Sequence, residues 1–274
     1  MSAELFIPRS LDEALGVLQT YGSGLLVMGG GTMMMAHLNE GVFFPKKVMS
    51  LARAGLSGIY RNGHTQIGAT TSLSKVSQLG DFPILADAAY QIGGPALRNM
   101  GTIGGNLYMP QPAGDMAVPL LTYDAHVELA SASNSRTIPL EAFLAEPRSR
   151  HGTQELLVAI HLPNPTGRTA YLKLGRREAN TPSVVTVGAR VVLDGQGQVS
   201  DVRIALGAAG SIAFRAKSAE AALVGQALNT NSIADAAQLA MEESDPFTDA
   251  LATAWYRRRM VGVFVKRTLE QLVK

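Results

Sequence analysis

The chain has 274 residues, of which 46% are hydrophobic and 17% charged, and its formal net charge is +2. This balance indicates a globular protein and, without a concentrated basic run, excludes nucleic acid as the main partner. Because the sequence has no cysteine, it also excludes disulfides, a thiol nucleophile and a cysteine-ligated iron–sulfur cluster held by this chain.

The sequence predicts a cytoplasmic protein. Its N-terminus, MSAELFIPRS, has no basic region followed by an apolar stretch, so we expect no secretory signal. No run of about 18 apolar residues occurs, so no membrane span is expected. The most basic stretch, Arg257–Arg259, lies in a helical pattern and is predicted to be a solvated face.

The N-terminal part of the chain predicts a strand–helix–strand unit. Ser10, with Glu13 three residues later, marks the start of a helix that ends at Gly22. Residues 24–31 form a short buried strand pattern that runs into glycines, and residues 46–51 suggest a further strand.

The middle of the chain changes to short alternating runs. A hairpin is predicted over residues 58–73, where such runs flank an Asn-Gly pair. Residues 81–92 look helical. Residues 125–140 alternate as a strand, a turn and a strand, and residues 155–163 as another strand.

A domain boundary is expected at residues 163–168, where two prolines and a glycine disfavour regular structure. Three strands of an antiparallel sheet are predicted after it, over residues 171–177, 184–194 and 199–210.

The remainder reads as helical. Ser232 and Asp235 suggest one helix N-terminus. The predicted helix over 249–273 has an apolar stripe, made of Leu251, Trp255, Phe264 and Leu269.

Two clusters of five glycines each need a physical reason, because glycine costs backbone entropy. They are Gly22, Gly24, Gly29, Gly30 and Gly31, and Gly93, Gly94, Gly101, Gly104 and Gly105. One reason is tight turns. Another is close approach of the backbone to a ligand, with N–H groups pointing at an anion such as phosphate.

The first cluster, GGGT at 29–32, follows a strand pattern and precedes a helix-compatible MMMAHL. That context suits phosphate binding at a helix N-terminus, although, taken alone, the loop is better explained as a structural turn. Neither a Walker A loop nor GxGxxG is present. The run of three methionines, 33–35, is predicted to fill the core rather than contact a cofactor.

The second cluster, RNMGTIGGN at 98–106, is another glycine-rich stretch that would suit close approach of a ligand to the backbone. Thr102 and Asn106 offer side-chain hydrogen bonds beside glycines that would expose main-chain donors. Two such loops suit an extended ligand such as a dinucleotide. Asp115 follows, and it either accepts hydrogen bonds from ribose hydroxyls or caps a loop turn.

These stretches, with PAGDMAVPLLTYDAHVEL at 112–129, closely resemble the FAD-binding, or medium, subunits of molybdenum hydroxylases. This family includes the carbon monoxide dehydrogenase flavoprotein and the xanthine dehydrogenase FAD domain, and the resemblance spans nearly the whole chain. It implies an α+β protein with a two-subdomain FAD fold of the vanillyl-alcohol-oxidase (PCMH) type over residues 1–165, divided into about 1–54 and 55–165. A C-terminal domain over 166–274 would combine a three-stranded antiparallel sheet with a helical bundle.

The resemblance also implies which residues hold FAD. Gly29 to Met33 match the first phosphate loop, and Asp115 matches an acidic residue that contacts the adenosine part. Leu157 matches a position whose backbone reaches the cofactor. The second loop is matched by Asn99, Gly101, Thr102, Ile103, Gly104, Gly105 and Asn106.

Lys173 matches a lysine near the flavin ring. A cation there would favour reduced, anionic flavin, whereas the residues alone predict an exposed strand lysine. In this sequence Met33 replaces a small polar residue, so it could contribute only its backbone. Asn180–Thr181 after the Arg-Arg pair also depart from the family pattern, and a four-cysteine insert found in some relatives is excluded.

The implied function is electron transfer within a complex, expected to be a dimer of heterotrimers. A large subunit would hold molybdopterin and a small one two iron–sulfur clusters, whose electrons the FAD passes to NAD, oxygen, a quinone or a carrier protein. We find no catalytic constellation or metal-ligand spacing, and the five scattered histidines are predicted to be surface or turn residues. The alternatives are a stand-alone NAD(P)H-dependent flavin oxidoreductase and a non-catalytic module that has lost FAD.

Overall fold

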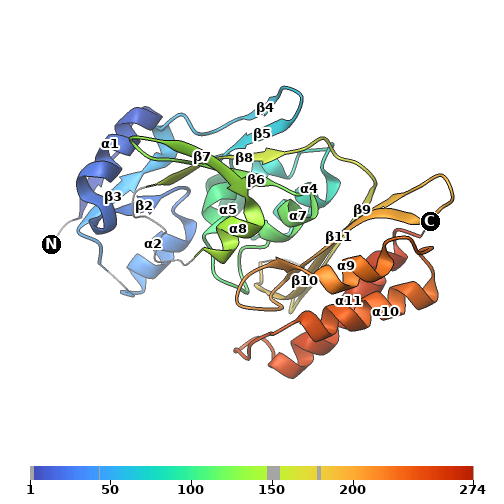
Figure 1. Ribbon diagram of the computed structural model, residues 1–274. Coiled ribbons are helices and arrows are strands. Elements are labelled where there is room, and N and C mark those ends of the chain that lie inside the picture. The colour runs from blue at the N-terminus through green and yellow to red at the C-terminus, as the bar shows by residue number, and fades with distance from the viewer. Residues whose placement is uncertain (1–2, 43, 147–154, 178–179, 274) are drawn as a thin grey trace. The chain divides into compact units, whose positions relative to one another are not determined.

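The computed structural model describes residues 3–42, 44–146, 155–177 and 180–273 (Figure 1). Contacts divide the chain into two compact units, which draw on alternating segments of the sequence. Unit 1 comprises Met1–Val76, Gly94–Tyr108 and Ala125–Pro163, and unit 2 comprises Ser77–Gly93, Met109–Asp124 and Asn164–Lys274. The predicted boundaries between the two FAD-binding subdomains, near residue 54, and before the C-terminal domain, at residue 165, stay predictions.

Unit 1 begins with a small parallel sheet of order β1-β3-β2. Its strands are β1 (Glu4–Phe6), β2 (Leu26–Met28) and β3 (Lys47–Ser50). Helix α1 (Leu11–Tyr21) lies along it and buries Leu18 against Met49 and its neighbours (Figure 1). As predicted, the Ser10 side chain accepts from the Glu13 N–H, and Gly22, with φ 48°, follows the last turn.

The larger sheet of unit 1 is antiparallel, with order β4-β5-β8-β6-β7. Its strands confirm the predicted hairpins: β4 (Ile59–Arg61), β5 (Thr65–Gly68), β6 (His126–Ala130), β7 (Ser135–Pro139) and β8 (Leu156–Leu162). Short helices complete the unit: α2 (Thr32–Asn39), α3 (Leu73–Val76), α5 (Pro95–Met100), α6 (Ile103–Leu107) and α8 (Leu140–Ala145), with 3-10 turns at Gly22–Gly24 and Leu51–Arg53.

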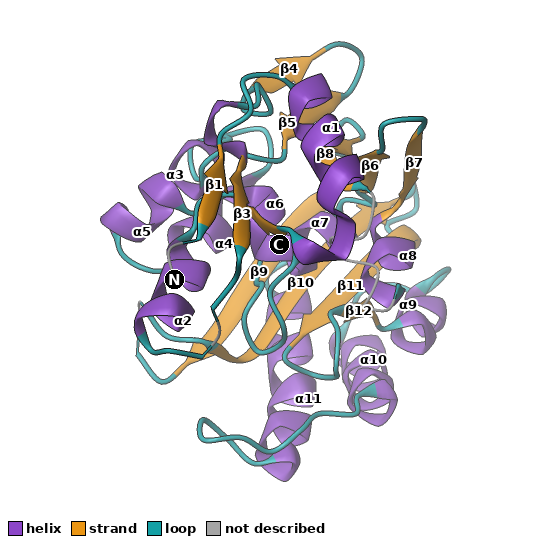
Figure 2. Ribbon diagram, turned by 90° about the vertical axis from the view of Figure 1, so that its left-hand side faces the viewer, coloured by secondary structure: helices purple, strands orange, loops and turns teal. Residues whose placement is uncertain are grey.

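Unit 2 is built on an antiparallel sheet of order β12-β11-β10-β9. Its strands are β9 (Arg168–Gly175), β10 (Ser183–Leu193), β11 (Val199–Gly207) and a short fourth strand that the sequence did not predict, β12 (Phe214–Arg215). Helices α9 (Lys217–Leu223), α10 (Thr230–Glu243) and α11 (Ala254–Glu270) gather on one face (Figure 2). Helices α4 (Pro83–Tyr90) and α7 (Ala117–Thr122) also belong to this unit.

Successive side chains of β10 point to opposite faces of this sheet, and different helices cover the two faces. Val185, Val187 and the alternate residues after them join the core beneath α9, α10 and α11. Gly188 points the other way, where a Cβ would lie 2.6 Å from Thr122 Oγ1 on α7. Glycine at this position therefore lets α7 approach the sheet closely.

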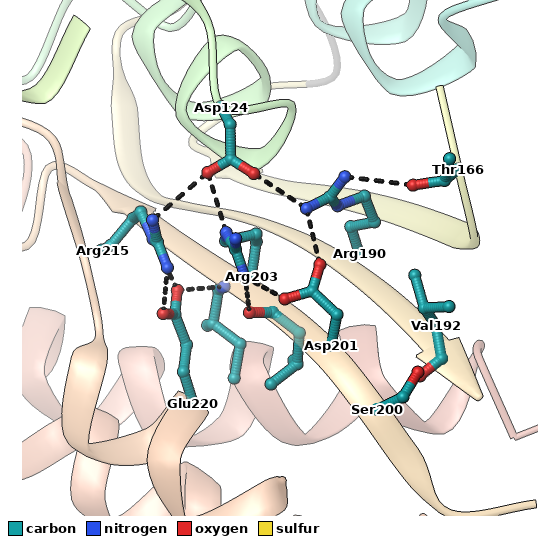
Figure 3. A network of polar contacts seen from close by, with 11 residues as sticks. Asp124, Thr166, Arg190, Val192, Ser200, Asp201, Arg203, Arg215 and Glu220 are labelled. Atoms are coloured by element: carbon teal, nitrogen blue, oxygen red, sulfur yellow. Dashed lines mark hydrogen bonds and ion pairs between the residues drawn. The ribbon is translucent and has the colours of Figure 1, made fainter. Parts of the chain in front are cut away.

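An aspartate directly after α7 anchors the helix to the sheet. Asp124 Oδ2 accepts a hydrogen bond from Arg190 Nη2 at 2.9 Å. Its Oδ1 accepts from Arg203 Nε at 2.8 Å and from Arg215 Nη1 at 3.2 Å (Figure 3). Three arginines from three strands thus converge on one carboxylate at the C-terminal end of a helix whose residues are all buried.

Two further carboxylates balance the arginine charges. Asp201 Oδ2 accepts from Arg190 at 2.9 Å, and Glu220 pairs with Arg215 at 2.5 Å (Figure 3). Glu220 also accepts from the backbone N–H of Ile204 at 2.8 Å, which ties α9 to β11. Because every charge has a partner, the network can sit in a partly buried position.

The C-terminal helices correct two predictions. Helix α10 begins after Asn229, whose side chain accepts from the backbone of Ser232, so Ser232 completes a capping box and is not itself the cap. In α11, Phe264 and Leu269 are buried as predicted, but Trp255 is 70% exposed. Among the described residues, no helix is both long and apolar enough to cross a membrane.

The prediction of a solvated face at Arg257–Arg259 is wrong for its first residue. Arg257 is fully buried in α11. Its Nη1 donates to the carbonyl oxygens of Ser183 and Val184 at 3.1 and 2.7 Å, and its Nη2 donates to Asp249 Oδ1 at 2.7 Å. Carbonyls at the start of β10 and one carboxylate therefore replace solvent around this guanidinium.

We expect Arg257→Met to lower the free energy of unfolding by roughly 3 kcal/mol, because it leaves two carbonyls and one carboxylate without their buried donor. Urea unfolding of the purified chain measures this loss. Arg259→Met, an exposed change in the same helix, should stay within about 0.5 kcal/mol of the wild type. Equal effects of the two substitutions would contradict the role assigned to Arg257.

The same pair predicts a pH dependence. Burial raises the pKa of Asp249, but hydrogen bonds from Arg257 and from the N–H groups of Ala252 and Leu251 outweigh it and lower the pKa overall. The pair therefore stabilises the fold above the unfolded aspartate pKa of about 3.9, and this contribution is lost as the pH falls through the lower folded value. The stability difference between wild type and Asp249→Asn should be full at pH 6 and shrink towards pH 3 in urea titrations. A difference that grows on acidification would show that the sign is wrong.

Candidate functional site: two glycine loops and a buried lysine–aspartate pair

The first glycine loop joins β2 to α2 in unit 1. Gly31 is the N-cap of α2 with φ 71°, a left-handed conformation that favours glycine. No side chain caps this helix, and no acceptor among the described residues bonds the N–H groups of Gly31, Thr32 or Met33. The start of α2 therefore offers several unpaired donors at the positive end of a helix dipole, which suits an anion such as phosphate.

The second glycine loop lies directly against the first. A Cβ on Gly29 would lie 2.8 Å from Thr102 Oγ1, and a Cβ on Gly30 would overlap the carbonyl oxygen of Met100. Neither contact leaves room for a side chain. The packing of one loop on the other thus explains two glycines, and the backbone conformation explains Gly31.

N–H groups of the second loop form hydrogen bonds within unit 1. Thr102 caps α6 by accepting from the N–H of Gly105 at 3.1 Å. The N–H of Ile103 donates to Thr71, and that of Gly104 to Ala69. The expectation that these glycines expose main-chain donors is therefore wrong for Gly104 and Gly105, and the loop instead supports the first one.

Other residues predicted on this loop differ in exposure. Gly104 is buried, and a Cβ there would lie 2.7 Å from the Ala69 carbonyl oxygen. Gly105 and Asn99 are exposed, and Asn106 is half-buried. Contact with FAD stays a prediction for all the residues assigned to this loop.

The three consecutive methionines do not fill a core. No residue of α2 is buried, and Met33 and Met35 are 41% and 47% exposed. The prediction of core filling is wrong because α2 is a short helix whose sides stay open. Exposed methionines immediately after the loop leave a flexible apolar surface beside the helix N-terminus.

Leu157 lies on β8 and is buried. Its backbone forms a hydrogen bond with the hydroxyl of Tyr108, which follows α6. Burial, partly opposed by this hydrogen bond, raises the pKa of Tyr108 to about 12. The backbone of Leu157, predicted to reach the cofactor, therefore has an internal partner within unit 1.

The two charged residues of the predicted site meet in unit 2. Lys173 Nζ on β9 lies 2.7 Å from Asp115 Oδ2, and both side chains are less than a tenth exposed. Ser183, at the start of β10, donates to Asp115 Oδ1 at 2.6 Å. Lys173 is thus not the exposed strand lysine that its sequence context suggests, and Asp115 does more than cap a turn.

This pair bears on the roles drawn from the resemblance. The resemblance places Asp115 at the adenosine part of FAD and Lys173 at the flavin ring. In the structure their side chains are in contact at 2.7 Å, and both contacts with FAD stay predictions. Ser183 was missed, because a serine before a strand carries no distinctive sequence signal.

Two hydroxyl groups near Lys173 have no hydrogen-bond partner among the described residues. Tyr171 precedes Lys173 by two positions and so lies on the same face of β9. Thr186 lies directly opposite Lys173 on β10. Both hydroxyl oxygens are buried and unpaired, and burial, with Asp115 and Asp87 nearby, raises the pKa of Tyr171 well above its usual value.

The histidines are less scattered in space than in sequence. In unit 1 His161 bridges His64, at 3.3 Å, and Glu128, at 3.0 Å. His151 lies outside the described residues. No group of three or more potential metal ligands occurs in the described part of the chain.

Comparison with known families agrees with the glycine loops and the C-terminal sheet. Residues 1–165 match the family described as the FAD binding domain in molybdopterin dehydrogenase. Residues 170–272 match the CO dehydrogenase flavoprotein C-terminal domain. Together the two matches cover nearly the whole chain.

Individual relatives are similar over nearly their full length. The chain is 32% identical to the 6-hydroxypseudooxynicotine dehydrogenase complex subunit alpha of Paenarthrobacter nicotinovorans, over 98% of this chain and 93% of that one. It is 31% identical to the carbon monoxide dehydrogenase medium chain of Hydrogenophaga pseudoflava, over 97% and 95%.

A solved structure extends the likeness to the fold. A chain of carbon monoxide dehydrogenase from Hydrogenophaga pseudoflava, in a form that lacks the Mo-pyranopterin moiety of the molybdenum cofactor, superposes with a TM-score of 0.91 and 29% identity. The match covers 99% of this chain and 97% of that one. The chain therefore belongs to the family of FAD-binding domains of molybdopterin dehydrogenases and is the FAD-carrying flavoprotein subunit of such an oxidoreductase.

Proposed function

We propose that this subunit receives electrons from iron–sulfur clusters of a small partner subunit and passes them to an external acceptor. Molybdopterin would be held by a large partner subunit, where the organic substrate reacts. Relatives described as a medium chain and as a subunit of a complex support an assembly of this kind. NAD, oxygen, a quinone or a carrier protein would serve as the acceptor.

One observation carries the proposal for this chain. The N-terminus of α2 has unpaired N–H groups, and the glycine loop before it is fixed by backbone contact with a second loop. Gly29 to Met33 would hold the diphosphate of FAD through main-chain donors, which explains why Met33 can replace a polar residue there. A fixed row of donors binds an anion without ordering cost at the moment of binding.

The remaining residues would position and enclose the cofactor. The second loop, from Asn99 to Asn106, would hold the first in place and would lie beside the ligand. Lys173, fixed by Asp115, would donate hydrogen bonds near the flavin ring. FAD itself supplies the redox chemistry, since it can accept and release electrons one or two at a time.

Gly30→Ala should abolish FAD retention, because the added methyl group must push the two loops apart. The ratio of flavin absorbance to protein absorbance in the purified chain, or in its complex, measures this loss. Gly24→Ala is the matched control, since a Cβ there meets no atom within 4 Å. A Gly30→Ala protein with the flavin content of the control would contradict the proposed loop geometry.

The isolated subunit should show a flavin spectrum. Where its acceptor is oxygen, a quinone or a carrier protein, its FAD should be reduced only slowly by NADH or NADPH, because its electrons come from a partner chain. Stopped-flow absorbance of the reconstituted chain with each nicotinamide tests this. Rapid bleaching would instead support either NAD as the acceptor or the stand-alone flavin oxidoreductase, and copurification with partner subunits separates these two. A colourless chain that added FAD cannot reconstitute, even beside its partners, would support the module that has lost its cofactor.

A further inference from the structure

The buried ammonium of Lys173 has unused hydrogen-bonding capacity. An ammonium has three donors, and among the described residues only Asp115 accepts from this one, at 2.7 Å. The Lys173 side chain is only 6% exposed, so few water molecules can reach the other donors. Unsatisfied donors on a buried charge are costly, so a ligand acceptor that takes the place of this water would form strong hydrogen bonds with the ammonium.

The partner of this lysine is itself held firmly. Ser183 donates to Asp115 Oδ1 at 2.6 Å, which leaves Oδ2 directed at Lys173. Ser183 is fully buried, and its carbonyl oxygen accepts from Arg257 at 3.1 Å. The chain of contacts from Arg257 through Ser183 and Asp115 to Lys173 therefore fixes the orientation of the ammonium.

The charge of the lysine is also compensated. Asp115 and Lys173 carry one negative and one positive charge at a separation of 2.7 Å. Tyr171 and Thr186, which lie on the same face of the sheet, add only neutral hydroxyls. A ligand beside this cluster would thus meet N–H donors with no net charge, which is different from meeting an isolated cation.

We infer that Asp115 and Ser183 are positioning residues for Lys173, and that Asp115 sets the flavin reduction potential by cancelling the lysine charge. This inference rests on the proposed function, in which Lys173 lies near the flavin ring. An isolated ammonium there would favour the reduced, anionic cofactor strongly, whereas the ion pair moderates that preference. Asp115 then acts at the flavin end of FAD through Lys173, and not at the adenosine end.

Asp115→Asn tests the inference, because it removes the negative charge while keeping a group of similar size beside Lys173 and Ser183. The midpoint potential of bound FAD, measured by anaerobic dye-coupled titration, should become more positive. The preference of the chain for reduced over oxidised FAD should rise by roughly tenfold or more, as expected for an uncompensated charge in a partly buried site. The double variant Asp115→Asn/Lys173→Met should return the potential to that of Lys173→Met alone.

Asp201→Asn is the matched control. Asp201 is also an ion-paired aspartate of unit 2, but it contacts Arg190 and Arg203, so its loss should leave the potential unchanged. Ser183→Ala should shift the potential in the same direction as Asp115→Asn but less, since the carboxylate remains.

The outcomes separate the inference from the proposed function. If the wild-type chain binds no FAD, the proposed function fails and the inference with it. If wild type binds FAD and Asp115→Asn keeps the same potential, only the inference is overturned. Complete loss of FAD in Asp115→Asn but not in Asp201→Asn would also overturn it, because Asp115 would then hold the cofactor directly.

Discussion

The candidate phosphate loop depends on one backbone contact, in which Gly30 lies so close to the carbonyl of Met100 that even a methyl group cannot be accommodated. That contact fixes the loop before α2 without using its N–H groups, so they remain available for an anion. If side chains held the loop by accepting hydrogen bonds from its N–H groups, fewer of these donors would remain for an anion. Sterically enforced packing is thus what allows a short, uncapped helix to keep a rigid and electrically positive end.

Unit 2 is organised by ion pairs rather than by close backbone packing. Helix α7 is wholly buried and has an aspartate shortly before it and another directly after it. Asp115 reaches Lys173 and Ser183, and Asp124 reaches three arginines. Ion pairs of this kind gain little free energy beyond the cost of desolvation, but breaking one leaves a buried charge unpaired. They therefore specify where the helix sits more than they add to stability, and in this way they place the lysine.

The sequence predicted what depends on local pattern and missed what depends on contacts between distant segments. The helix from Ser10 to Gly22, the hairpins and the glycine loops follow from caps, alternation and turn chemistry. Arg257 sits in a run of arginines that reads as a solvated surface, yet the carbonyls that bury it lie on a strand more than 70 positions away. Separations of 68 and 58 positions likewise hide the partnership of Asp115 with Ser183 and Lys173.

The glycine loops show the same limit on a smaller scale. Their composition correctly indicates unusual backbone geometry, but it cannot distinguish glycines that face a ligand from glycines that face another loop. Gly104 and Gly105 are adjacent, and one packs on Ala69 while the other is exposed. Only the three-dimensional arrangement shows which of the two is packed and which is open.

The alternation of segments between the units has a consequence for the order in which the chain folds during synthesis. Helices α4 and α7 leave the ribosome long before β9, β10 and β11, the strands on which unit 2 is built. Until those strands emerge, the face of α7 that packs on β10 and β11 and the carboxylate of Asp115 lack the partners that these strands supply in the folded chain. Unit 2 therefore forms late, through contacts between residues distant in sequence. A nascent chain paused before β9 would expose an apolar helix, which is the kind of surface that chaperones bind.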